Sequence, residues 1–138
     1  MKTEFHDIDT AFDFVSYGRP GEHSAILDKG SGKIYYESVF GDSDGVPDEV
    51  LDSGNTVEIP RKNLLDLGQR LVFRFVGEFM PDDFGRVETI FSRRSAYAYY
   101  KDLLEEREML DSWHAYEKAA TQKAIREWCA DEGIELLD

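Results

Sequence analysis

Hydrophobic residues recur along the chain at two spacings, and these spacings predict where helices and strands lie. In residues 8–15 the apolar positions follow helical steps of three and four. Asp7 or Asp9 is placed to cap the first turn, and Gly18 and Pro20 end the run. The pattern therefore predicts a short helix near the amino terminus.

Two short β-favouring runs, residues 25–27 and 34–36, flank the sequence Gly30-Ser31-Gly32. Glycine adopts the positive φ that a tight turn requires, so this segment predicts a β-hairpin. Because a lone hairpin is marginally stable in water, we expect a third strand, and residues 56–59 before Pro60 are the best candidate.

The rest of the chain has helical periodicity. Residues 64–80 form a wide apolar band that predicts a central helix, with Asn63 as its cap. Pro81 ends this band, and a short apolar face follows in residues 84–91. We therefore expect a helical carboxyl-terminal region.

Two apolar stripes in tandem mark the last two helices. Ser92 or Ser95 opens the first, Asp111 is expected to cap the second, and Gly133 is expected to end it in the left-handed conformation. Stripes of this kind predict helix packing on helix. The first stripe contains Ala96, Tyr97, Tyr100, Leu103 and Leu104, and the second contains Trp113, Tyr116, Ala120, Ala124 and Trp128.

These elements predict the fold class α+β, with a small antiparallel sheet (the hairpin plus one strand) packed against a carboxyl-terminal helical bundle. The predicted order is α-β-β-β-α-α-α. A chain of 138 residues can bury about two thirds of its unfolded surface, which is enough for one core. We therefore expect residues 1–138 to form a single domain.

Charge and composition narrow the classes of partner. The chain has 16 basic and 29 acidic residues and a net charge of -13, which opposes binding to duplex nucleic acid. No apolar stretch approaches the length of a membrane-spanning helix, so we expect no membrane association. The single cysteine, Cys129, excludes an internal disulfide and favours the cytoplasm. The oligomeric state is not encoded in any recognisable pattern.

Few residues have the spacing that catalysis or metal binding requires. The acidic segment 42–52 is expected to be a solvated loop, although a weak cation site there stays open. Asp111 and His114 are three apart on a helix, but a metal site needs further ligands, and Cys129 is expected to be an inert thiol. We assign no catalytic residue, no metal ligand and no cofactor.

One basic and aromatic segment, residues 93–101, departs from the acidic background. Arginine beside aromatic rings at a helix start suits a carboxylate, a phosphate or an exposed base, whereas packing of the tyrosines inward would explain the same pattern. The candidate ligand-binding residues are Arg94, Tyr97, Tyr100, Lys101 and His114.

Several short motifs spread over most of the chain match a known family pattern. They are residues 27–34, Glu58-Ile59-Pro60, Arg94-Ser95-Ala96-Tyr97, Tyr100-Lys101-Asp102, Trp113, Tyr116, Trp128 and Gly133-Ile134. In these motifs the chain resembles an uncharacterised family of mainly bacterial proteins, number 0158 of the UPF (uncharacterised protein family) series. It departs from the family pattern at Ser95, where glycine is usual, and at Ala98 and Tyr99, where basic residues are common. The resemblance implies a small intracellular α+β protein and brings no established activity.

Three hypotheses about function follow. The first is a non-catalytic module that binds a protein partner or regulates one, because no nucleophile, base and oxyanion donors are assembled in the sequence. The second is a binder of single-stranded nucleic acid or of a small anionic ligand through Arg94, Tyr97 and Lys101. The third is an enzyme whose site combines residues distant in sequence, such as Arg94, Tyr97 and His114.

Overall fold

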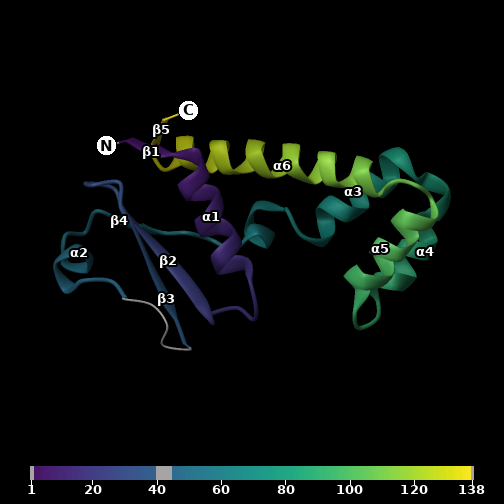
Figure 1. The fold of residues 1–138 in the computed structure, drawn as a ribbon, viewed down its shortest axis with the longest axis horizontal. Coiled ribbons are helices and arrows are strands. Elements are labelled where there is room, and N and C mark those ends of the chain that lie inside the picture. The colour runs from purple at the N-terminus through teal and green to yellow at the C-terminus, as the bar shows by residue number, and fades with distance from the viewer. Residues whose placement is uncertain (1, 40–44, 138) are drawn as a thin grey trace. The chain divides into compact units, whose positions relative to one another are not determined.

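The structure is a computed structural model that describes residues 2–39 and 45–137. The α+β class is confirmed, with a small antiparallel sheet of three strands and a helical carboxyl-terminal region (Figure 1). The elements are β1 (Lys2–Glu4), α1 (Phe5–Ser16), β2 (His23–Asp28), β3 (Ile34–Ser38), α2 (Asp48–Asp52), β4 (Thr56–Glu58), the 3-10 helix η1 (Lys62–Leu65), α3 (Gln69–Phe79), the 3-10 helix η2 (Pro81–Asp83), α4 (Phe84–Phe91), α5 (Ala96–Glu106), α6 (Leu110–Asp131) and β5 (Glu135–Leu137).

The chain divides into two compact units. Unit 1 contains residues 1–65 and 122–138, and unit 2 contains residues 66–121. Helix α6 is continuous from Leu110 to Asp131, so its first part belongs to unit 2 and its last part to unit 1.

The predicted hairpin is confirmed in unit 1. Strand β2 pairs antiparallel with β3 on one side and with β4 on the other, which gives the sheet order β3-β2-β4. The carboxylate of Asp28 stabilises the turn, because it accepts hydrogen bonds from the amide of Gly30 at 3.0 Å and from the hydroxyl of Ser31 at 2.8 Å. Gly32 has a φ of 81°, the left-handed backbone that the sequence predicts for this turn.

The core of unit 1 joins α1, the sheet and the end of α6. Apolar side chains of α1 meet those of β2, and the ring of Phe12 lies edge-on to Trp128 with 5.3 Å between centroids. The buried members of this core are Ile8, Ala11, Phe12, Val15, Ala25, Leu27, Ile59, Ile125, Cys129 and Ile134.

The two ends of α1 are held in ways that the sequence did not predict. The helix begins at Phe5 directly after β1, and neither Asp7 nor Asp9 is its N-cap residue. At its carboxyl end, the guanidinium of Arg61 donates to the carbonyl oxygens of Val15, Ser16 and Gly18 at 3.0–3.2 Å. Strand β1 also pairs in parallel with β5, which brings the chain ends together (Figure 1).

Aromatic rings fill the core of unit 2. Trp113 of α6 meets the rings of Phe75 and Tyr100 edge-on, each with 5.3 Å between centroids. Leu71, Val72 and Val76 of α3 and Leu103 and Leu104 of α5 are also buried. The inward stripe predicted for the last helix is therefore confirmed at Trp113.

Three expectations about the helical region are wrong. Helix α6 begins at Leu110, so Asp111 lies inside its first turn and is not the cap residue before it. Helix α3 begins at Gln69 rather than after Asn63, because Asp66 has a left-handed backbone that separates η1 from α3, and Leu64 is 72% exposed. Tyr97 was expected on the buried stripe with Tyr100, but it is 55% exposed while Tyr100 is fully buried. Tyr97 lies in the first turn of α5, where the contact of its ring with Phe91 leaves much of the side chain exposed.

The predicted end of α6 is confirmed in detail. Gly133 has a φ of 72°, the amide of Ile134 donates to the carbonyl of Cys129 at 2.8 Å, and the Gly133 amide donates to Ala130 at 3.1 Å. These two bonds form a Schellman motif. Helix α5 ends with the same motif, but there Glu108 occupies the left-handed position at a φ of 57°.

The two Schellman motifs provide a matched pair of substitutions. Gly133→Ala should lower the free energy of unfolding by about 1 kcal/mol, because the added Cβ meets no atom within 4 Å and the loss comes from the backbone alone. Glu108→Gly should raise it by up to about 1 kcal/mol, since it relieves left-handed strain. Urea unfolding of both variants measures this, and a loss in Glu108→Gly would contradict it.

The tryptophans report on the two units separately, because Trp113 lies in unit 2 and Trp128 in unit 1. We expect one cooperative transition, since both units require α6 to be formed. In Trp113→Phe and in Trp128→Phe, the urea midpoint from fluorescence should match the midpoint from far-UV circular dichroism. A fluorescence midpoint that precedes the circular dichroism midpoint in either variant would indicate two separate domains.

Candidate functional site

Charge is distributed unevenly between the units. Unit 2 has 8 basic and 11 acidic residues, for a net charge of -3, whereas the rest of the chain has 8 basic and 18 acidic residues, for -10. Within unit 2, residues 84–101 contain four basic residues and one acidic residue. Within unit 2, positive charge is therefore concentrated along α4, the turn after it and the start of α5.

The turn between α4 and α5 shapes this surface. The hydroxyl of Ser92 donates to the carbonyl of Thr89 at 2.6 Å, and the amide of Arg93 donates to Ile90 at 3.2 Å. Ser95 then takes a left-handed backbone with a φ of 59°, directly before α5 begins. Positive charge just beyond the carboxyl end of α4 is favourable, because that end of a helix is partially negative.

A cleft of about 520 Å³ lies between α4 and α5, and we call it the arginine cleft. Three arginines and one half-exposed tyrosine line it together. Its lining residues are Arg86, Thr89, Ile90, Arg93, Arg94, Tyr99 and Asp102.

The three arginines differ in their partners. Arg86 donates to the carboxylate of Glu106 at 3.1 Å, which ties α4 to α5. Among residues 2–39 and 45–137, Arg93 and Arg94 have no ion pair and no side-chain hydrogen bond. Both are exposed, so their donors are available to an anion.

Of the five residues that the sequence indicates for ligand binding, Arg94 is the one that lines the arginine cleft. Tyr97 packs edge-on against Phe91 at 5.1 Å, and desolvation together with Glu117 raises its pKa. Desolvation also raises the pKa of Tyr100, whose hydroxyl is buried without a hydrogen-bond partner. Lys101 and His114 are exposed and do not line the cleft.

The sequence did not indicate Arg86, Arg93 or Tyr99 as ligand-binding residues, although Arg93 and Tyr99 lie in the basic and aromatic segment 93–101. A signal for the first two existed, because Arg86, Thr89 or Ile90, and Arg93 follow one another at steps of three and four and so share a face of α4 and its extension. The position of Tyr99 follows from the packing of α5 on α4, which no local spacing records.

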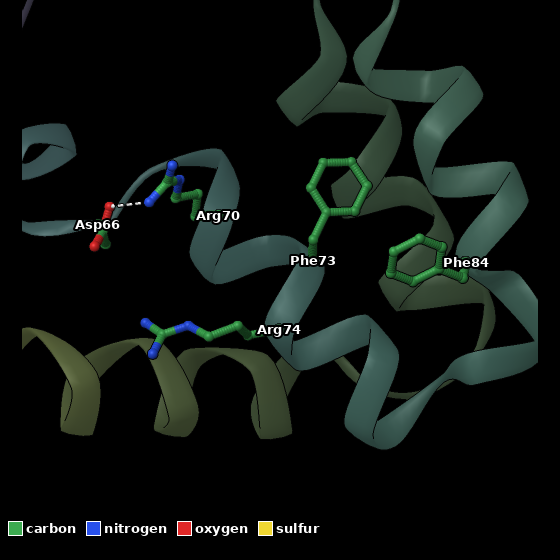
Figure 2. Close-up of a pocket in the computed structure, with 5 residues that line it drawn as sticks. All are labelled: Asp66, Arg70, Phe73, Arg74 and Phe84. Carbon is green, nitrogen blue, oxygen red and sulfur yellow. Dashed lines mark hydrogen bonds and ion pairs between the residues drawn. The ribbon is translucent and has the colours of Figure 1, made fainter.

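A second cleft of about 420 Å³ lies beside α3, also within unit 2, and we call it the α3 cleft. Figure 2 shows the guanidinium groups of Arg70 and Arg74 extending from α3 in the direction of Asp66. The rings of Phe73 and Phe84 lie farther from Asp66, beyond the two arginines. Arg70 pairs with Asp66 at 3.2 Å, and Asp66 has a left-handed backbone.

A third cleft contains an ion pair that joins η2 to the end of α5. Both nitrogen contacts of Arg107 with the Asp83 carboxylate are 3.1 Å long, so the pair is bidentate. This hydrogen bonding from Arg107 holds the pKa of Asp83 below its ordinary value. The pair is a structural clamp.

The remaining sequence expectations concern metals, thiols and membranes. Burial raises the pKa of the Cys129 thiol to about 11. No group of three histidine, cysteine, aspartate or glutamate side chains that suits a metal ion occurs in residues 2–39 and 45–137, and residues 42–44 of the acidic segment fall outside that part. In the same part of the chain, no helix is long and apolar enough to cross a membrane.

Comparison with known proteins gives no match to a protein-family model, to a curated protein or to a solved structure. Membership of the family that the sequence motifs resemble therefore stays a prediction. The clefts of unit 2 are the basis on which function can be argued.

The Asp83–Arg107 pair predicts a pH dependence of stability. The folded-state pKa of Asp83 lies below the ordinary value of 3.8, so the pair stabilises the fold above that pH and is lost as the pH falls through the folded pKa. The urea midpoints of the wild type and Asp83→Asn should differ at about pH 6 and converge toward about pH 3. Asp82→Asn is the control, and an Asp83→Asn difference that stays constant with pH would contradict the prediction.

Proposed function

We propose that the protein is a non-catalytic binding module of the cytoplasm that docks an acidic segment of a partner protein in the arginine cleft. The observation that carries this proposal is the convergence of Arg86, Arg93 and Arg94 on one cleft. Two of these arginines have no acidic partner in the described part of the chain, although the chain has 29 acidic residues.

The chemistry of arginine supports a carboxylate as the group that is bound. A guanidinium presents its donors in a planar fork that matches the two oxygens of a carboxylate, and such charge-assisted bonds are stronger than neutral ones. Arg93 and Arg94 are adjacent in the chain and exposed. They offer two such forks to neighbouring acidic side chains of a partner.

The rest of the cleft supports a peptide as the bearer of the carboxylates. Ile90 and Tyr99 line it beside the arginines, so apolar contact accompanies charge. Tyrosine and arginine are enriched among the residues that dominate binding energy in protein interfaces. Tyr99 is 57% exposed and therefore has surface left to bury against a partner.

Single-stranded nucleic acid is the second candidate. The exposed rings of Tyr97 and Tyr99 near Arg94 favour it, because bases stack on aromatic side chains. The net charge of -13 opposes it, since phosphate repulsion acts along the whole strand. We therefore rank it below a short acidic segment of protein.

Fluorescence anisotropy with a labelled peptide of alternating glutamate and leucine tests the proposal. The double variant Arg93→Gln/Arg94→Gln should bind at least about tenfold more weakly, because it removes two charge-assisted contacts. The matched control Lys101→Gln/Lys118→Gln has the same net charge but changes residues outside the arginine cleft, and it should bind within about twofold of the wild type.

The same assay separates the alternatives. Equal weakening by both double variants would show that only net charge matters and would contradict the cleft. A labelled oligothymidine that binds more tightly than the peptide, with a steep salt dependence and a loss of affinity in Tyr97→Ala/Tyr99→Ala, would favour the second candidate instead.

A further inference from the structure

We propose that the α3 cleft is a separate binding site for a small molecule that joins an anionic group to an aromatic or other apolar group. The residues that carry this proposal are Arg70, Arg74, Phe73 and Phe84 (Figure 2). None of them lines the arginine cleft, so this site does not depend on the function proposed above.

Two arginines supply the anionic end of the site. Arg74 has no ion pair and no side-chain hydrogen bond with residues 2–39 and 45–137. Arg70 pairs with Asp66, but both side chains of that pair are mostly exposed, and exposed pairs are weak. An incoming anion can therefore gain contacts with Arg74 and, at little cost, with Arg70.

The start of α3 adds a second, independent reason for an anion. Its N-cap residue is Gly68, no side chain caps it, and no acidic residue lies in its first turn. The amides of Gln69 and Arg70 consequently have no acceptor within the helix.

The first turn of α3 contains no acidic residue, as is also the case in α4 and α5. Asp7 lies in the first turn of α1 and Asp111 in that of α6, where acidic groups suit the positive end of the helix. Helix α3 instead has Arg70 in its first turn and Arg74 one turn later. A bound anion would offset the charge of the two guanidinium groups, and Arg70, which lines the cleft, is itself in the first turn of α3.

Two phenylalanine rings supply the apolar end. Phe73 and Phe84 lie with 5.4 Å between centroids, and both are partly exposed. A Cβ added to Gly77 would lie 3.8 Å from Phe84, in ordinary contact, so α3 passes close to that ring. A flat apolar group can pack against these rings while its anionic group reaches the arginines.

The size of the cleft limits the ligand to a small molecule. Its volume of about 420 Å³ falls at the lower end of the range for small-molecule sites in proteins. Carboxylates and phosphate esters of aromatic or short acyl groups have the required length and charge. Phenyl phosphate is a suitable probe, with inorganic phosphate and phenol as its two halves.

Titration of the ¹⁵N-labelled full chain with phenyl phosphate, followed by NMR, tests the site. We expect shift changes at the amides of Gln69 and Arg70 and at the Arg70 and Arg74 side chains. Phenyl phosphate should bind at least about tenfold more tightly than either half. Arg74→Gln should weaken binding at least about tenfold, whereas the matched control Arg93→Gln should leave it within about twofold.

Three outcomes would overturn the inference. Equal affinities for phenyl phosphate and inorganic phosphate would remove the apolar part of the site, and shift changes centred on Arg93 and Arg94 would move the ligand to the arginine cleft. Unchanged binding in Arg74→Gln, with a urea midpoint like that of the wild type, would exclude the α3 cleft. The two clefts share no lining residue. A negative result for phenyl phosphate at the α3 cleft therefore does not contradict the proposed function of the arginine cleft.

Discussion

Helix α6 supplies buried side chains to both compact units, and this double use constrains the whole structure. Near its amino end Trp113 lies in the ring cluster of unit 2, and near its carboxyl end Ile125 and Cys129 lie in the core of unit 1. Isolated helices are marginal in water, so a helix of this kind is maintained by the apolar face that it buries. Each unit therefore depends on a helix that the other also stabilises.

Three residues of unit 2 that lie between helices have strained backbones, and two of them lie at the candidate clefts. Asp66, Ser95 and Glu108 all have left-handed backbones without being glycine, at a cost of about 1–2 kcal/mol each. Asp66 lines the α3 cleft, and Ser95 lies between Arg94 of the arginine cleft and the start of α5. Burial of Tyr100, Leu103 and their neighbours offsets this cost, so the core of unit 2 fixes the geometry of its surface.

The sequence predicts those features that depend on neighbours along the chain. The hairpin turn at Gly32 and the end of α6 at Gly133 were predicted because positive φ and glycine go together locally. The pairing of β1 with β5 and the contacts of Arg61 with the end of α1 join residues far apart in sequence, and no local pattern records them. The clefts are likewise lined by residues from different helices. The sequence therefore indicated Arg94 as a ligand-binding residue but not Tyr99, whose place in the cleft depends on how α5 packs on α4.

Convergence, rather than the absence of ion pairs, is the reason to assign binding to these clefts. Exposed ion pairs contribute little to stability, so a single arginine without a partner implies little about function. Three arginines line one cleft and two line the other, whereas each lining contains a single carboxylate, Asp102 in the arginine cleft and Asp66 in the α3 cleft, so positive charge exceeds negative charge in both. Both clefts are built on α4, where Phe84 contributes to one and Arg86 to the other. Val87 is the fully buried residue of α4. Its burial holds α4 in place and so supports both candidate sites.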